Sequence, residues 1–504
     1  MAKAQKLFEE LRQHANQTNI LTATRALLDW DQQTMLPEMA SEFRSQQAIW
    51  FAGEIHRRKT SPQLGDLLGE LSQSDLAVDP NSDTGATIRE MKRDYDKQSK
   101  LPLKLVEELA GTTSRGQQIW IKARKADDFP KFAPVLKQII HLKRQEAEAL
   151  GYDDCPYDAL LDEYEPQAKT KEVAEVLEAL RKDLVPLVSE IADSRVEIPT
   201  EILRRKFPRL AQEAFVRKTS AYLGFDYQRG RLDTAHHPFC TEVGPHDCRM
   251  TTRFDENYFN CAFFGTLHEA GHGMYEQGLR SEFYGLPPGK YCSLGIHESQ
   301  SRLWENLVGR RLSFWQHFYA IAQEKFPTAL HDTALTDFYR AINQVKPSLI
   351  RVEADEATYN LHIIIRFQLE QELINGELEI DDLPTAWNER YQEFLGLTPP
   401  NDADGVLQDI HWSAGLIGYF STYSLGNLHA SQMFKTAEAE LGDMDLMFRM
   451  GEFEPLLTWL NQNVHQHGMC YSSKELGEKV TGSPLSHAPL IAQLRQKLAP
   501  IYGL

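Results

Sequence analysis

The sequence predicts a mainly α-helical protein with at most one small β-sheet. Apolar residues recur at helical spacing over most of the 504 residues, as in the first segment, where Leu7, Phe8 and Leu11 share one stripe. Strand-like alternation is rare and is confined to 225–255, where Gly and Pro separate short β-rich pieces. No internal repeat or low-complexity linker divides the chain, so we expect a single domain over 1–504, built either as one body or as two lobes with a groove.

The helices follow one another along the chain. In LPLKLVEELAG we expect a helix that begins near Pro102 and ends near Gly111. The segment 171–193 carries an inward stripe that includes Val173 and Leu177. Similar patterns predict helices over 131–150, 209–223, 299–324, 335–344, 349–375 and 430–440. The first 150 or so residues are predicted to form helical hairpins that cover a groove.

Composition excludes some classes of protein. A net charge of −18 argues against nucleic-acid binding, because phosphate recognition needs a basic face. We find no apolar run of about 18 residues, so no membrane-spanning helix is expected. The N-terminus lacks the apolar region of a secretory signal, and the six cysteines are scattered without a CxxC pair. We therefore expect reduced thiols and a cytoplasmic protein.

The stretch FGTLHEAGHGMYEQG at 264–278 carries the strongest chemical signal. Four residues of α-helix turn about 400°, so His268 and His272 share one face and can hold one zinc ion. Glu269 lies beside that face, where it can take a proton from a zinc-bound water. Gly271 and Gly273 would allow another element to approach closely. A short motif also arises by chance, and alone it leaves zinc and coincidence about equally favoured.

A hydrolytic zinc site takes three protein ligands and keeps one position open. After a loop, the segment IHESQSRLWEN opens a second helical run that could return antiparallel to the first and bring Glu298 to the two imidazoles. By itself a carboxylate at a helix start is explained by the helix dipole. Together with the upstream motif, we favour Glu298 as the third ligand. His297 is the alternative, but two His and one Glu is the common peptidase set.

Two groups downstream could stabilise a tetrahedral oxyanion. The segment 405–426 holds His411 and Tyr423 among aromatic residues and glycines. Either side chain could donate a hydrogen bond to the developing charge. Buried His and Tyr residues are also common in protein cores, where their polar atoms are simply satisfied by neighbours.

Substrate recognition needs a group that reads a carboxylate. Arg351 and Asp355 stand four residues apart, which on a helix predicts an ion pair. In the functional interpretation Asp355 holds the guanidinium, and Arg351 receives a terminal carboxylate through two parallel hydrogen bonds. Arg249 offers the same chemistry.

Six motifs follow one another along the chain: HPF at 237–239, DxRxT at 247–251, HExxH at 268–272, HESQSR at 297–302, IRxxAD at 350–355 and GxxQDxHW at 405–412. This ordered set closely resembles the carboxypeptidase Taq family of zinc metallocarboxypeptidases, and LLDWDQQTMLP at 27–37 also looks like that family. One departure is Ser421, where family members often have Pro, and it predicts a looser loop around Tyr423.

The resemblance implies a nearly all-helical, neurolysin-like fold with a deep groove, formed by a single catalytic domain whose zinc-site core spans about 225–430. It implies a cytoplasmic homodimer. It also implies stepwise release of C-terminal residues from peptides with a free C-terminus, with broad side-chain tolerance and poor cleavage near proline. Zn²⁺ is the expected ion, and Co²⁺ could replace it in such a nitrogen and oxygen site.

The resemblance also assigns roles. It implies that Glu269 is the general base and acid, and that Arg351 reads the terminal carboxylate, with Arg249 as a second candidate. His237 of the HPF motif is a further candidate for substrate binding. The remaining implied roles are zinc ligation by His268, His272 and Glu298, and oxyanion stabilisation by His411 and Tyr423.

Two other functions remain open from the residues. An endo-oligopeptidase on the same scaffold would share the zinc site without needing a carboxylate-reading arginine. A non-catalytic protein that binds peptides or zinc would need no Glu269, so the presence of that residue argues against it.

Overall fold

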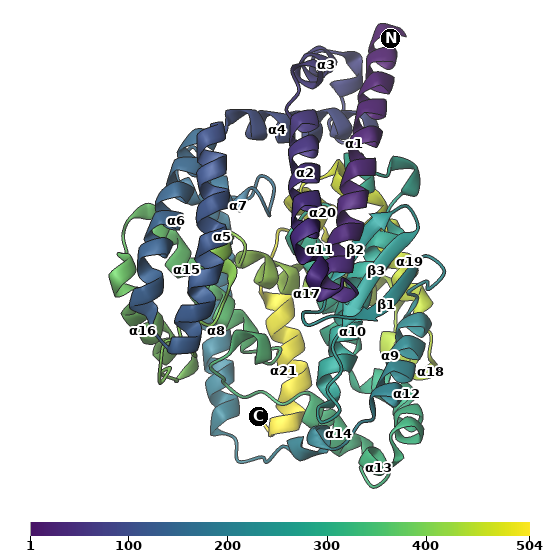
Figure 1. Ribbon diagram of the computed structural model, residues 1–504. Coiled ribbons are helices and arrows are strands. Elements are labelled where there is room, and N and C mark those ends of the chain that lie inside the picture. Colours follow the sequence, from purple (N-terminus) through teal and green to yellow (C-terminus); the bar gives the residue numbers. More distant parts are fainter. Residues whose placement is uncertain (1) are drawn as a thin grey trace. The chain divides into compact units, whose positions relative to one another are not determined.

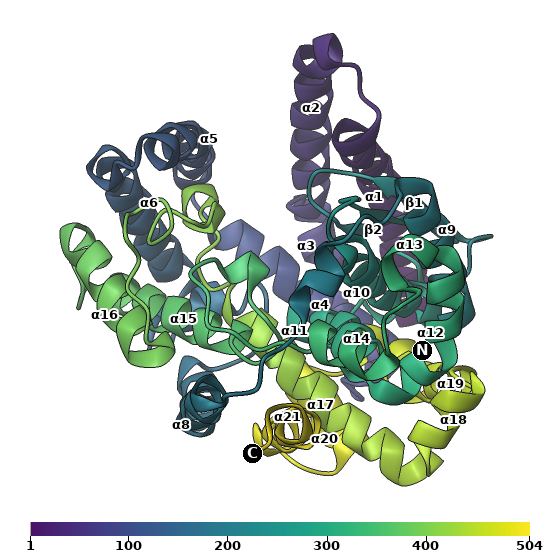
Figure 2. The same cartoon turned by 90° about the horizontal axis from the view of Figure 1, so that it is seen from below.

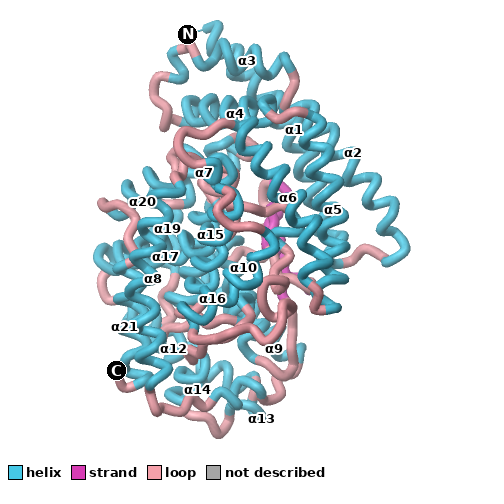
Figure 3. The backbone as a smooth tube through the Cα atoms, turned by 90° about the vertical axis from the view of Figure 1, so that its left-hand side faces the viewer, coloured by secondary structure: helices cyan, strands magenta, loops and turns pink. Residues whose placement is uncertain are grey.

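The structure is a computed structural model that describes residues 2–504, and it is mainly helical with one small sheet, as predicted (Figure 1). In Figure 3 the strands occupy a short stretch among many helices. The chain divides into two compact units. Unit 1 contains the residues up to Ser99, Ile198–Ile342 and Met433–Pro484, and unit 2 contains Lys100–Glu197, Asn343–Gln432 and Leu485–Leu504. The prediction of a single catalytic domain stays a prediction.

Unit 1 holds the sheet and a majority of the helices. Its long N-terminal helices α1 and α2 lie side by side (Figure 1). The helices of unit 1 are α1 (Ala2–Thr34), α2 (Ser41–Lys59), α3 (Pro62–Ser72), α4 (Asp83–Lys100), α9 (Arg209–Leu223), α10 (Phe259–Gly278), α11 (Leu294–Arg302), a π-helical turn (Leu303–Val308), α12 (Leu312–Lys325), α13 (Pro327–Leu330), α14 (Leu335–Ile342), α18 (Met444–Met450), α19 (Glu454–Asn463) and α20 (Ser473–Thr481).

Unit 2 is helical, and its helices α15 and α16 lie side by side (Figure 2). Helix α17 (Ser421–Leu441) begins in unit 2 and ends in unit 1. The other helices of unit 2 are α5 (Leu103–Ala126), α6 (Phe129–Leu150), α7 (Pro156–Leu161), α8 (Thr170–Asp193), α15 (Tyr359–Asn375), α16 (Leu383–Leu395) and α21 (Ala488–Tyr502). Among the described residues, none of these helices or those of unit 1 is long and apolar enough to cross a bilayer.

The sheet lies within the predicted 225–255 region and has the strand order β1-β3-β2. Strand β1 (Gly230–Thr234) pairs parallel with β3 (Asp247–Thr252), and β2 (Cys240–Gly244) pairs antiparallel with it. Side chains alternate between the two faces of a strand. On β3 the side chain of Cys248 faces α10, whereas that of Arg249 faces α1 and packs over Trp30.

Helix α10 is held by its packing at both ends. Near its start, Phe259 and Phe263 join a buried aromatic cluster with Trp315. Further along, a Cβ at Gly271 would lie 2.6 Å from the carbonyl oxygen of Gln300, and one at Gly273 would meet the ring of Phe225 at 2.5 Å. The predicted close approaches at both glycines are confirmed. They allow α11 and the rest of unit 1 to press directly on this helix.

Four predicted helix boundaries are wrong. The helix predicted over 430–440 begins earlier, at Ser421, as α17. The helix after Pro102 does not end near Gly111, because that glycine lies inside α5 and its backbone continues as a regular helix. The predicted helix over 299–324 is interrupted after the π-helical turn by a short loop. The predicted helix over 349–375 begins only at Tyr359, and the ten residues before it form loops and one 3₁₀ turn, Arg351–Glu353. In 349–358, hydrogen bonds from the Gln408 side chain to the backbone of Leu349 and Arg351 take the place of helical hydrogen bonds.

Candidate active site

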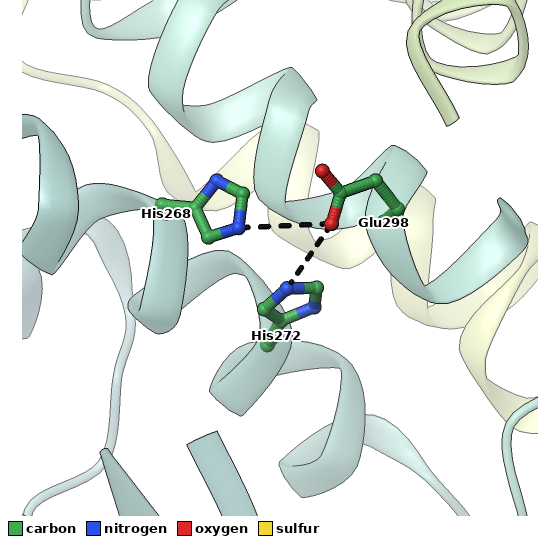
Figure 4. A group of neighbouring side chains, drawn as sticks. All are labelled: His268, His272 and Glu298. Carbon is green, nitrogen blue, oxygen red and sulfur yellow. Dashed lines mark ion pairs between the residues drawn. The ribbon is translucent and has the colours of Figure 1, made fainter. Parts of the chain in front are cut away.

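Helices α10 and α11 bring two imidazoles and one carboxylate together (Figure 4). Oε2 of Glu298 lies 3.6 Å from Nε2 of His268 and 3.5 Å from Nε2 of His272. The three potential ligand atoms lie within 4.8 Å of one another, and no other such group of three occurs among residues 2–504. The fold therefore brings the three predicted metal ligands together, with Glu298 of α11 beside the two histidines of α10.

The residues present fit a small divalent cation. Zinc binds imidazole nitrogen and carboxylate oxygen at about 2.0–2.2 Å, so one ion can sit between atoms separated by roughly 3.5 Å. In both histidines Nδ1 has a partner of its own, a carboxylate for His268 and a backbone carbonyl oxygen for His272, so Nε2 is the nitrogen that can bind a metal. The donor set supplies three ligands and leaves room for a fourth, as in hydrolytic zinc sites.

Glu298 is oriented by its own helix. Nε of Arg302 donates to Oε1 of Glu298 at 2.7 Å, which leaves Oε2 directed at the two histidines. Burial acts to raise the pKa of Glu298, but Arg302 and the two imidazoles outweigh it and lower that pKa strongly. The carboxylate is therefore ionised and ready to bind a cation.

His268 is held by a carboxylate that the sequence analysis missed. Its Nδ1 lies 2.9 Å from Oε2 of Glu305, which stands in the π-helical turn. There the N–H of Gly309 donates to the carbonyl oxygen of Trp304, five residues back, instead of four. Burial raises and Arg302 lowers the pKa of Glu305, with a net value of about 2. An ionised carboxylate behind the ring fixes its tautomer and makes Nε2 a better ligand.

His272 is held by the backbone and by a stacked ring. Its Nδ1 lies 3.1 Å from the carbonyl oxygen of His297, and the two rings stack at 4.2 Å. Nε2 of His297 instead contacts Glu276 at 2.9 Å. The group of three ligand atoms therefore includes Glu298 and not the alternative, His297. Burial lowers the pKa of His272 to about 3, so the ring is neutral, which is the form that binds metals.

Glu269 follows His268 on α10 and is 5% exposed. Burial is the main cause that raises the pKa of Glu269 to about 7. A carboxylate with a pKa in this range can both accept and return a proton near neutral pH.

The segments HPF and DxRxT are joined within unit 1. The backbone N–H of Phe239 donates to Oγ1 of Thr251, and the N–H of Thr251 donates to the carbonyl oxygen of Phe239. His237 is exposed in the connection between β1 and β2. Arg249 makes a bidentate ion pair with Asp247 at 2.7 and 2.8 Å.

In unit 2, Arg351 does not pair with Asp355 as predicted. Because 349–358 is not helical, the four-residue spacing does not bring the two side chains together. Asp355 instead accepts hydrogen bonds from the backbone N–H groups of Lys346, Ala357 and Thr358. The guanidinium of Arg351 pairs with Asp409, whose Oδ1 lies 3.0 Å from Nε and 2.8 Å from Nη2.

Arg351 shares its surroundings with the predicted oxyanion residue Tyr423. Its guanidinium carbon lies 5.4 Å from the centre of the Tyr423 ring. Tyr423 stands in the first turn of α17, so the predicted loose loop around it is wrong: the helix begins at Ser421. Burial raises the pKa of Tyr423, which keeps the phenol protonated as a hydrogen-bond donor. His411 begins a 3₁₀ turn, His411–Ala414, in the same unit.

The arrangement in unit 1 is that of a metallopeptidase centre with three potential protein ligands and a buried carboxylate, Glu269, next to one of them. A model of the carboxypeptidase Taq (M32) metallopeptidase family matches residues 10–498. Thermostable carboxypeptidase 1 of Thermus thermophilus is 44% identical, over 98% of this chain and 99% of that protein. Carboxypeptidase 1 of Bacillus subtilis is 37% identical, over 95% of both chains.

The fold comparison agrees with the sequence comparison. A crystal structure of an M32 carboxypeptidase from Deinococcus radiodurans R1 has a TM-score of 0.96 and 38% identity, and the match covers 99% of this chain and 100% of that one. The chain belongs to the carboxypeptidase Taq (M32) family and is a metallocarboxypeptidase. This confirms the predicted family and the predicted carboxypeptidase activity.

We expect Glu305→Gln to weaken zinc binding by roughly 10- to 100-fold, because the ring of His268 loses its ionised partner. Competition with a chromophoric chelator measures the affinity, and thermal unfolding of the metal-free protein checks the fold. Glu70→Gln, which removes an exposed ion pair with Lys3 in the same unit, serves as the control. An unchanged zinc affinity in a folded Glu305→Gln variant would contradict the role of this carboxylate.

Proposed function

We propose that the protein releases single C-terminal amino acids from peptides, with broad side-chain tolerance, by means of one zinc ion held by His268, His272 and Glu298. The observation that carries this proposal is the convergence of these three ligand atoms in a chain of the M32 family. Nitrogen and oxygen donors suit zinc, and Co²⁺ could replace it at the same ligands. The family resemblance further suggests a cytoplasmic homodimer.

Glu269 performs the proton transfers in this proposal. When bound, the ion supplies a Lewis acid that polarises the scissile carbonyl and acidifies water. Glu269 takes a proton from the attacking water and later gives it to the leaving amine. Its burial and its position next to His268 support both steps. His411 and Tyr423 donate hydrogen bonds to the oxyanion.

Arg351 reads the terminal carboxylate of the substrate. A guanidinium has five N–H groups. Two of them donate to Asp409 and one donates to the hydroxyl of Tyr359. One N–H therefore remains on each terminal nitrogen, which is the pair that can receive a carboxylate through two parallel hydrogen bonds. Fixing the carboxylate there places the cut one residue from the end of the peptide.

Arg249 and His237 are the further candidates for substrate binding. Arg249 keeps three N–H groups beyond its pair with Asp247, and its side chain lies on the α1 face of the sheet. His237 is exposed and available to a peptide. Because Arg249 does not face α10, we assign the main carboxylate contact to Arg351.

We expect Glu269→Gln to keep stoichiometric zinc and to lower kcat by roughly 10²- to 10⁴-fold, because the amide cannot accept the proton of water. Metal analysis of the purified variant and a peptide-hydrolysis assay on the same sample test both parts. Near-normal turnover by a metal-replete sample would refute the assignment.

The carboxylate requirement is tested with one peptide in two forms, a free C-terminal acid and a C-terminal amide. We expect the zinc-loaded protein to produce a ladder of one-residue losses from the acid and to leave the amide intact, because only the acid can bind Arg351. Mass spectrometry follows both reactions. Internal cuts in both forms would reject single-residue release and would leave Arg351 as a structural residue.

A further inference from the structure

Asp409 lies among the basic side chains of unit 2. Its side chain is 9% exposed, and its two oxygens have different partners. Oδ1 accepts from Nε and Nη2 of Arg351, and Oδ2 accepts from Nε of Arg366 at 2.6 Å. Arg366 is fully buried in the middle of α15. One carboxylate thus links the Arg351 guanidinium to a buried side chain of α15.

The same carboxylate also faces His411. Nδ1 of His411 lies 3.9 Å from Oδ1 of Asp409, which is too long for a hydrogen bond but places the imidazole directly beside the carboxylate. Burial acts to raise the pKa of Asp409, but Arg366, Arg351 and His411 outweigh it and lower that pKa. The ionised carboxylate thus lies beside the ring of His411 as well as both guanidiniums.

The neighbouring residue Gln408 fixes the backbone that carries Arg351. Its Oε1 accepts the N–H of Arg351 at 2.9 Å, and its Nε2 donates to the carbonyl oxygen of Leu349 at 3.0 Å. Two consecutive residues, Gln408 and Asp409, thus hold the main chain and the side chain of Arg351, and His411 follows two positions later. The short segment 408–411 therefore carries both the residues that hold Arg351 and the proposed oxyanion residue His411.

We infer that Asp409 is a positioning residue for the reaction, which sets the Arg351 guanidinium for the substrate carboxylate and the His411 imidazole for the oxyanion. This inference rests on the proposed roles of Arg351 and His411. It gives the QD pair of the GxxQDxHW motif a physical role, because substrate reading and oxyanion stabilisation share one carboxylate. Loss of Asp409 therefore impairs both, whereas loss of Arg351 or His411 impairs mainly one.

The experiment compares kcat and KM of Arg351→Met, His411→Phe and Asp409→Asn on one free-acid peptide. We expect Arg351→Met to raise KM roughly 10- to 100-fold, and His411→Phe to lower kcat roughly 10²- to 10³-fold. Asp409→Asn should raise KM and lower kcat together, each by about 10-fold or more. Bound zinc, measured on each sample, should stay stoichiometric because the ligands lie in unit 1.

Two further variants test whether Asp409 acts on the reaction or only stabilises the fold. Glu356→Gln removes another largely buried ion pair of unit 2, with Lys497, and should lower the melting temperature without changing KM. In the double variant Arg351→Met with Asp409→Asn, we expect no further rise in KM but a further fall in kcat through His411. An additional rise in KM would show that Asp409 does not act through Arg351.

The outcomes separate the inference from the proposed function. If Arg351→Met and His411→Phe leave both constants unchanged, the proposed roles fail, and the inference fails with them. If those variants behave as expected but Asp409→Asn keeps both constants, the inference alone is wrong. Should Asp409→Asn not fold, Asp409→Glu keeps the charge next to Arg366 but displaces the carboxylate by one methylene. If Asp409→Glu changes both kcat and KM, the inference is supported. If it changes neither, the inference is overturned.

Discussion

The close packing of α10 against α11 at Gly271 is the constraint on which the site depends. No side chain fits there, because a Cβ would lie 2.6 Å from the backbone of Gln300 and Ser301. The approach places Glu298 opposite the histidines of α10, close enough for all three to share one ion. The aromatic cluster near Phe259 anchors the other end of α10, so apolar packing also fixes the helix that carries both histidines.

Charged and polar neighbours also hold the three ligand side chains in place. The carboxylates of Glu298 and Glu305 lie next to the two imidazoles and are balanced by guanidinium groups. Arg302 contacts both carboxylates, and Arg310 contacts Glu305. Each ligand also has its own support: a carboxylate behind His268, a backbone carbonyl behind His272 and a guanidinium beside Glu298. These supports come from the one segment that also carries Glu298, so ligand and supports move together.

Features that depend on spacing along the chain could be predicted from the sequence, whereas features that depend on tertiary contacts could not. The pairing of His268 with His272 follows from helical spacing alone, and the small sheet follows from Gly and Pro punctuation. Glu305 could not be found this way, because a π-helical turn has no recognised spacing in the sequence and alters which side chains share a face. The partner of Arg351 was also beyond local reasoning: an apolar pattern over 349–375 suggested a helix, but tertiary hydrogen bonds from Gln408 hold that backbone in a loop.

The central claim, that His268, His272 and Glu298 form the metal centre, is tested most directly by anomalous diffraction at the zinc absorption edge from crystals of the zinc-loaded protein. The account predicts one strong peak at about 2.0–2.2 Å from Nε2 of both histidines and from Oε2 of Glu298. A strong peak elsewhere, with no anomalous density at these three residues, would contradict it.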